Sequence, residues 1–117
     1  MEVAETLRVE SVAAWREWLA AHHADRREIW LVPDRKGPHQ RTPNYDDILD
    51  EAVCQGWIDG LVRGLDDSRY LMRWTPRRRG GNWTATNRDR ARRLSTAGRL
   101  TAAGLASLPD DLRAELG

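Results

Sequence analysis

The chain has 117 residues, a formal net charge of +1, and 40% hydrophobic residues that include six tryptophans and no phenylalanine. These values predict one folded domain and exclude a disordered chain, and we expect tryptophan to take over the packing role of phenylalanine. No apolar run approaches the roughly 18 residues of a membrane span, and the acidic start without an apolar signal core predicts a cytoplasmic protein with no membrane partner.

The first half of the chain predicts two helices and one short strand. Ser11 is the expected N-cap of an amphipathic helix that ends near residues 22–24. Residues 29–32 form a short apolar run before a proline, which is typical of a strand. The Thr-Pro pair at residues 42–43 predicts the start of a second helix, and Gly56 is its expected end. Apolar residues follow this start at helical spacing: Tyr45, Ile48, Leu49, Ala52 and Val53.

Two alternating segments in the middle of the chain predict an antiparallel hairpin. Residues 57–63 and 69–74 alternate between apolar and polar positions, and a polar turn over residues 64–68 joins them. Asp66 and Asp67 lie in this turn and are expected to stabilise it.

Three helices are predicted after a loop over residues 76–82. Thr84 or Thr86 is expected to cap a basic helix that runs to about Ala97 and is ended by Gly98. Two short helical segments complete the chain: residues 101–108 and 109–116. The whole order predicts an α+β fold in a single domain over residues 1–117. We expect a small antiparallel sheet, made of the hairpin plus one further strand, flanked by helices.

The stretch RWTPRRRGGNWTATN, residues 73–87, predicts a ligand-binding pocket. Arginine binds carboxylate or phosphate with fixed geometry, tryptophan supplies a flat apolar wall, and glycine lets a ligand approach the backbone. No nucleophile, metal set or cofactor fingerprint accompanies these residues, so we expect no metal and no cofactor. Six residues are predicted to form the site. Arg73 and Arg77 would hold an anionic group, Trp57 and Trp83 would form the pocket walls, and Asn82 and Asn87 would orient polar atoms of the ligand.

The charge layout leaves three interpretations open. Residues 73–99 hold nine arginines and one acid, a net charge of +8, whereas residues 1–72 carry −5 and residues 100–117 carry −2. The basic block either pairs with the acidic helices inside the fold or forms an anion-binding face. Its arginines also alternate with Trp74 and Trp83, as in proteins that bind single-stranded nucleic acid. The sequence pI near 8 and the acidic remainder favour the first two interpretations.

Asp59 is the one candidate catalytic residue. It lies inside a predicted strand, where aspartate is disfavoured, so we expect it to pair with Arg73, Arg77 or Arg78. Such a pair is either structural or part of a site in which the carboxylate binds a ligand amine or acts as a general base. The sequence does not decide between a binding protein and an enzyme.

The remaining reactive side chains favour structural roles. His22 and His23 are adjacent at a helix end and His39 lies in a loop, which is not the spacing of a metal site. Cys54 is the only cysteine, which excludes an internal disulfide. It lies near the C-terminal end of a helix, where the helix dipole opposes thiolate formation, so a buried packing role is expected.

Several motifs in this order resemble the bacterial YdeI/OmpD-associated family. They are WREWLAAHHA, EIWLV, YDDILDEAVCQGWIDG, DDSRYLMRWTPRR, NWTATNRDRARRL and AGRLTAAGLASL. The resemblance covers about residues 10–108. The sequence departs from the family at Trp74, where phenylalanine is usual, and at Gly81 and Thr84, where serine is usual. Many members also continue into a C-terminal helical segment beyond the point where this sequence ends.

The resemblance implies a shared fold and site, and a role in protection from bacteriocins or antimicrobial peptides. Combined with the residues above, it predicts a protein that binds a small molecule or a peptide carrying an anionic or planar group. A small cofactor-independent enzyme with an Asp/Arg site and a nucleic-acid-binding module are the alternatives. The sequence makes no prediction about the oligomeric state.

Overall fold

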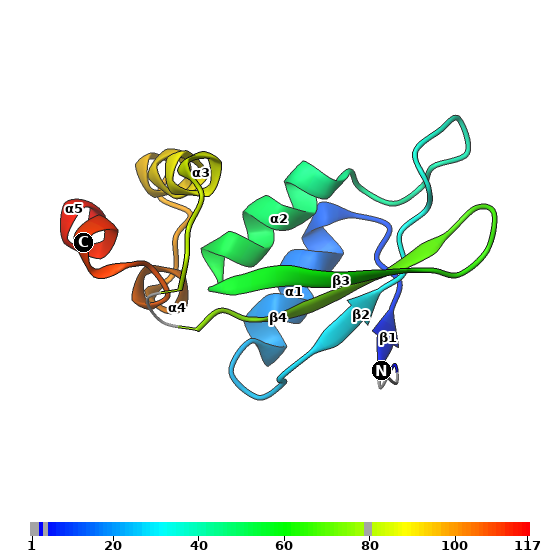
Figure 1. Ribbon diagram of the computed structural model, residues 1–117, viewed down its shortest axis with the longest axis horizontal. Helices are drawn as coiled ribbons and strands as arrows, with labels where there is room; N and C mark the ends of the chain where they lie inside the picture. Colours follow the sequence, from blue (N-terminus) through cyan, green and yellow to red (C-terminus); the bar gives the residue numbers. More distant parts are fainter. Residues whose placement is uncertain (1–2, 4, 79–80) are drawn as a thin grey trace.

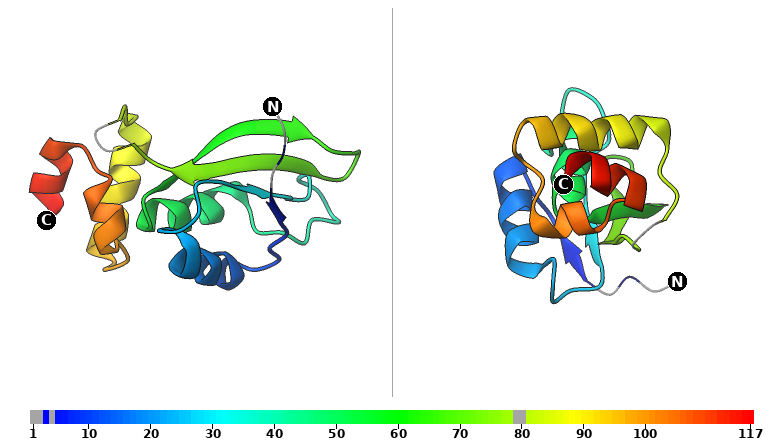
Figure 2. Two further views of the ribbon diagram at one scale, coloured as in Figure 1. Left: turned by 90° about the horizontal axis from the view of Figure 1, so that it is seen from below. Right: turned by 90° about the vertical axis from the view of Figure 1, so that its left-hand side faces the viewer.

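The chain forms a sheet with two helices on one face and three helices packed at one end (Figures 1 and 2). The computed structural model describes residues 3, 5–78 and 81–117. Its elements follow the order β1 (Thr6–Leu7), α1 (Val12–His22), β2 (Ile29–Leu31), α2 (Tyr45–Cys54), β3 (Trp57–Gly64), β4 (Tyr70–Pro76), α3 (Ala85–Thr96), α4 (Ala102–Ala106) and α5 (Asp110–Leu116).

The sheet has four strands in the order β1-β2-β4-β3. The predicted hairpin pairs β3 with β4, and the predicted further strand, β2, lies antiparallel to β4 on its other side. The α+β class in a single domain is therefore confirmed. The expectation of a purely antiparallel sheet of three strands is wrong, because β1 adds a fourth strand parallel to β2. At two residues, β1 is too short for an alternating pattern to indicate it.

Side-chain caps fix where the helices begin. The Ser11 side chain accepts a hydrogen bond from the Ala14 N–H at 3.0 Å, and Thr84 caps α3 in the same way, both as predicted. The predicted start of α2 at residues 42–43 is wrong, because Asn44 is the cap and helical residues begin at Tyr45. The Thr42 hydroxyl instead accepts from the Asp34 N–H in the preceding loop.

Four tryptophans build the centre of the core between the sheet and the helices α1 and α2. Trp15 stacks on Trp18 with ring centroids 5.6 Å apart, and it also contacts Trp74 at 5.8 Å. Trp18 meets the edge of Trp57 at 5.6 Å. Such aromatic pairs contribute roughly 0.5–1.5 kcal/mol each beyond the burial of their surface. Tryptophan thus fills the core of a chain that has no phenylalanine, as predicted.

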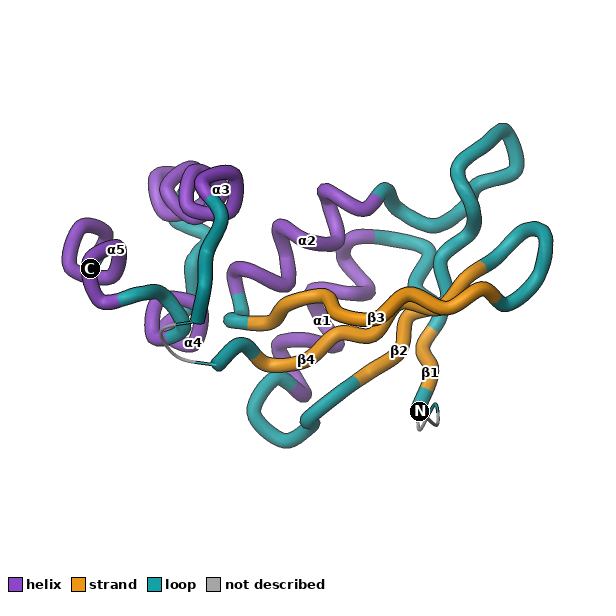
Figure 3. The backbone as a smooth tube through the Cα atoms, in the orientation of Figure 1, coloured by secondary structure: helices purple, strands orange, loops and turns teal. Residues whose placement is uncertain are grey.

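The helices α3, α4 and α5 form a second, smaller cluster beyond the end of the sheet (Figure 3). α4 joins this cluster to the first core through close backbone contact. A Cβ added at Gly104 would lie 2.2 Å from the carbonyl oxygen of Cys54, so only glycine fits at this contact. The Thr101 hydroxyl donates to the same carbonyl at 2.7 Å. Trp83 packs against both clusters and therefore lies at their boundary.

Most arginines of the basic block are paired with carboxylates inside the fold. Two buried acids of α2, Asp50 and Glu51, make the central contacts, and we call them the buried acid pair. Asp50 binds Arg90 at 2.5 Å and Arg93 at 2.8 Å. Six of the eight arginines described in residues 73–78 and 81–99 form such ion pairs: Arg73, Arg88, Arg90, Arg92, Arg93 and Arg99. Fewer cationic groups are therefore left for phosphates than the sequence suggested.

Candidate functional site

Four side chains from separate parts of the chain form the candidate site, which we call the Arg77 site: Tyr45, Asp59, Arg77 and Trp83. Tyr45 begins α2, Asp59 lies in β3, Arg77 directly follows β4, and Trp83 precedes α3. Pairing of β3 with β4 and packing of α2 on the sheet bring these positions together. Two of the residues were predicted ligand-binding residues, and Asp59 was the candidate catalytic residue.

Asp59 is held by a tyrosine rather than by an arginine. It lies opposite Trp74 in the hairpin and accepts a hydrogen bond from the Tyr45 hydroxyl at 2.9 Å. Burial and this hydrogen bond raise the pKa of Tyr45 to about 12, so its hydroxyl stays protonated at neutral pH and remains a donor. The predicted ion pair of Asp59 is wrong, because no nitrogen of Arg73, Arg77 or Arg78 lies within 4.0 Å of its carboxylate.

Arg77 is half-buried, and among the described residues no carboxylate is bonded to it. Its backbone N–H donates to the Gly56 carbonyl at 2.8 Å, which fixes the residue at the end of the hairpin. The guanidinium lies over the Trp83 ring, 3.8 Å from the ring centroid, a cation–π contact. Its Nε is buried and makes no hydrogen bond. Burial lowers the pKa of Arg77, while the charge of Asp59 and the hydroxyl of Tyr45 act to raise it. The group remains a cation at neutral pH.

An unbonded, half-buried guanidinium is energetically unfavourable. Burial of a polar group without a hydrogen bond costs roughly 1–3 kcal/mol in proteins, and charged groups cost more. Arg73, four residues earlier, avoids this cost by binding Glu28 at 2.5 Å. The Arg77 guanidinium therefore keeps donors that a ligand carboxylate can satisfy with charge-assisted hydrogen bonds.

A small apolar cavity lies next to Tyr45. Its wall includes Tyr45, Ile48, Met72 and Trp74, and its volume is about 20 Å³. That volume admits about one water molecule. The indole N–H of Trp74 is buried and has no hydrogen-bond partner among the described residues. The cavity therefore presents a mainly apolar surface and is too small in this conformation for a ligand ring.

Four predicted site residues are not part of the Arg77 site. Trp57 is only 1% exposed and its indole donates to the His23 carbonyl, so it packs in the core and walls no pocket. Arg73 lies beside Trp30 on β2 and binds Glu28. The side chains of Asn82 and Asn87, both in the described part of the chain, make no hydrogen bond. Asn87 contributes only its backbone N–H to the α3 cap.

Tyr45 is the site residue that the sequence interpretation missed. Its position in the helical pattern of α2 predicted a core residue, yet 42% of it is exposed. The hydroxyl reaches Asp59, fourteen positions later in the chain. An aromatic residue in the first turn of a helix gives no sequence pattern that would indicate this contact, because it depends on how α2 crosses the hairpin.

The other reactive side chains have structural surroundings. Burial raises the pKa of Cys54 to about 11, so its thiol stays protonated, in agreement with a packing role. Over residues 3, 5–78 and 81–117 no group of three or more His, Cys, Asp or Glu side chains is placed to hold a metal ion. In the same residues no helix is both long and apolar enough to cross a membrane.

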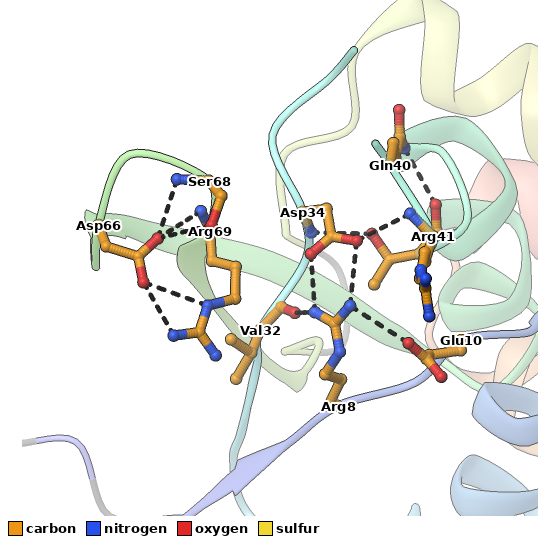
Figure 4. A network of polar contacts seen from close by, with 10 residues as sticks. Arg8, Glu10, Val32, Asp34, Gln40, Arg41, Asp66, Ser68 and Arg69 are labelled. Atoms are coloured by element: carbon orange, nitrogen blue, oxygen red, sulfur yellow. Dashed lines mark hydrogen bonds and ion pairs between the residues drawn. The ribbon is translucent and has the colours of Figure 1, made fainter. Parts of the chain in front are cut away.

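A second, larger cleft lies between the loop after β2 and the turn of the hairpin (Figure 4). Its volume is about 520 Å³ and its walls are polar. Arg8 binds both oxygens of Asp34, at 2.9 and 3.0 Å, and this lowers the pKa of Asp34 to about 2. Asp66 accepts from the backbone N–H groups of Ser68 and Arg69, which confirms its predicted role in the turn. Asp34, which lines the cleft, and Asp66, in the neighbouring turn, are thus already bound within the fold.

Comparison with known families places the site inside a defined domain. The sequence model of a family described as "Domain of unknown function (DUF8412)" matches residues 7–107. The chain belongs to the DUF8412 family. The match covers all four residues of the Arg77 site, while α5 lies outside the matched DUF8412 region. Comparisons with curated proteins and with solved structures found no match.

Proposed function

We propose that this DUF8412 protein binds a small molecule or a peptide that carries an anionic group, with Arg77 as the anion-binding residue. The observation that carries the proposal is the half-buried Arg77 guanidinium, which has an unbonded Nε and stacks on Trp83. A ligand carboxylate would bind the two terminal nitrogens of this guanidinium, which make no hydrogen bond among the described residues. The exposed ring of Tyr45 beside Trp74 offers an apolar surface for the rest of the ligand.

The physiological role we propose is protection from, or response to, an antimicrobial compound, in the cytoplasm. Its support is the resemblance of the motifs around residues 45–94 to the YdeI/OmpD-associated family, since the family description of DUF8412 names no activity. These motifs contain all four residues of the Arg77 site. The resemblance and the geometry therefore point to the same part of the chain.

Calorimetric titration with indole-3-acetate, a planar anion, tests the binding proposal. We expect Arg77→Ala to weaken binding roughly 10- to 100-fold, the equivalent of a charge-assisted hydrogen bond of about 1.5–3 kcal/mol. Arg78→Ala is the matched control, because it removes the same charge at the next, exposed residue. Equal losses in the two variants would contradict a specific role for Arg77.

The same titration separates pocket binding from nucleic-acid binding. If a single-stranded oligonucleotide were the ligand, Arg77→Ala and Arg92→Ala would weaken its binding by similar factors. Each variant would also reduce the slope of the logarithm of the binding constant against the logarithm of the salt concentration by about one. The ion pairs of Arg92 with Asp89 and Glu115 favour the pocket, because this arginine is already engaged within the fold. A steep salt dependence with equal losses would support the nucleic-acid alternative.

A small enzyme is the second candidate, favoured by the hydrogen bond between Tyr45 and Asp59 next to Arg77. Asp59 would act as a general base and Arg77 would stabilise developing negative charge. Hydrolysis of a 4-nitrophenyl ester that carries a carboxylate tests this role. An enzyme should lose turnover in Asp59→Asn with KM nearly unchanged, whereas a binding protein shows no turnover and keeps its affinity for indole-3-acetate.

A further inference from the structure

The Arg77 site contains two opposite charges that do not neutralise each other directly. No nitrogen of Arg77 lies within 4.0 Å of the Asp59 carboxylate, yet the two residues lie at the same end of the hairpin. Asp59 is opposite Trp74, and the Arg77 N–H donates to the Gly56 carbonyl. The charge of Asp59 acts to raise the pKa of Arg77, although burial lowers it overall. Among the described residues neither one forms an ion pair with another side chain. Oδ2 of Asp59 accepts from Tyr45, and within the same residues its Oδ1 has no hydrogen bond.

This arrangement disfavours a ligand that carries only negative charge. An anion bound to Arg77 would lie in the field of the nearby Asp59 carboxylate, and like charges repel each other in a half-buried site far more strongly than in bulk water. A ligand ammonium placed against Oδ1 of Asp59 removes that repulsion. The same ligand's carboxylate then satisfies the free donors of Arg77.

We propose that the ligands of this site are zwitterions of the α-amino acid type with an aromatic side chain, which deepens the proposed function and rests on it. Asp59 binds the ammonium group and Arg77 binds the carboxylate. Tyr45 positions Asp59 through its hydroxyl and offers its exposed ring to the ligand's side chain. An α-amino acid holds its two charged groups on one carbon, so a single ligand can supply a partner to each of the two protein charges.

Three related probes separate the contributions of the two charges. L-Phenylalanine carries both groups, N-acetyl-L-phenylalanine lacks the ammonium, and L-phenylalanine amide lacks the carboxylate. In calorimetric titrations with the wild-type protein, L-phenylalanine should bind at least 10-fold more tightly than either derivative. Asp59→Asn should weaken L-phenylalanine about 10-fold and leave N-acetyl-L-phenylalanine unchanged or bound more tightly, while Arg77→Ala should weaken both.

Asp67→Asn is the matched control for Asp59→Asn, since it makes the same change at an exposed turn residue. Tyr45→Phe is a second variant, which keeps the ring and removes the hydroxyl that positions Asp59. It should weaken L-phenylalanine a few-fold and leave the N-acetyl derivative unchanged. Thermal melting of each variant checks that it folds.

Three results would contradict the proposal, and they are distinguishable. If N-acetyl-L-phenylalanine binds as tightly as L-phenylalanine and both depend on Arg77, the site takes simple anions; the zwitterion proposal then fails and the proposed function stands. If none of the three probes and no indole-3-acetate binds, both fail together. Equal losses in Asp59→Asn and Asp67→Asn would also contradict a direct contact between Asp59 and the ammonium.

Discussion

Two arginine-rich regions around α2 use the same residue type in different ways. At the buried acid pair, Asp50 binds Arg90 and Arg93, and Glu51 binds Arg16 and Arg99. These contacts join α2 to α1, to α3 and to the segment that follows α3. At the Arg77 site the guanidinium stacks on Trp83 and binds no carboxylate. An arginine with a carboxylate partner thus joins elements of the fold, whereas Arg77, which has none among the described residues, keeps donors for a ligand.

The largest expected effect on stability comes from the buried acid pair. Asp50→Ala should lower the free energy of unfolding by about 3 kcal/mol, because it leaves the partly buried Arg90 without its closest carboxylate. Urea unfolding followed by tryptophan fluorescence measures the loss. Asp47→Ala, an exposed acid in the first turn of α2, is the control and should cost less than about 1 kcal/mol. Equal costs would show that the buried acid pair contributes no more than a surface charge.

Acid should weaken the same region. Burial acts to raise the pKa values of Asp50 and Glu51, but hydrogen bonds from their arginines outweigh it, so both pKa values lie below their usual values of 3.8 and 4.5. The unfolded chain then takes up protons at a higher pH than the folded chain. The stabilisation is complete above about pH 4.5 and is lost as the pH falls through the lowered values. Melting temperatures between pH 7 and pH 3 measure the loss. The melting temperature should fall less steeply with decreasing pH in Asp50→Ala than in the wild-type protein. Identical declines in the two proteins would show that protonation of the buried acid pair is not the cause.

Removal of the unpaired arginine should change stability little. In Arg77→Met the cation–π contact with Trp83 is lost, a cost of roughly 0.5–1 kcal/mol, while the burial penalty of an unbonded guanidinium is relieved. We expect the free energy of unfolding to stay within about 0.5 kcal/mol of the wild-type value. Affinity for indole-3-acetate should nevertheless fall as in Arg77→Ala. A loss of stability as large as that of Asp50→Ala would indicate a structural role for Arg77.

The smallest effect is expected at Arg92. This arginine pairs with Asp89 and Glu115 on the exposed side of α3. Such surface pairs often contribute nothing measurable, because solvent screens them and two long side chains lose freedom. Arg92→Ala should therefore leave the urea midpoint unchanged within error. A clear destabilisation would mean that ion pairs of the basic block stabilise the fold even at its surface.

Local patterns predicted most of the secondary structure. Ser11 and Thr84 cap their helices as expected, and alternation located both strands of the hairpin. These patterns are reliable because each one depends on neighbours a few residues away. The start of α2 was wrong because two polar residues on either side of Pro43, Thr42 and Asn44, can both cap a helix. The loop uses Thr42 for a contact with Asp34, which no local pattern indicates.

The candidate site was only partly predictable. Arg77, Trp83 and Asp59 were identified from residue types that suit ligand binding and from an acid in a strand. Trp57, an equally plausible wall, is buried among the core tryptophans, because its strand places it on the face that α1 and α2 cover. Tyr45 belongs to the apolar face that helical spacing predicts for α2. That spacing does not show which residues at the margin of the apolar face remain exposed to solvent.

The sequence by itself determined the fold class, the caps of α1 and α3, the hairpin and the concentration of arginine between residues 73 and 99. Tertiary structure alone decided which of these arginines are paired. The partners of Arg90 and Arg99 lie 40 and 48 positions away, and Tyr45 meets Asp59 across 14 positions. Charge interactions act through space over a few ångströms, so they depend on how α2 packs against the hairpin and α3. Local sequence rules carry no information about that packing.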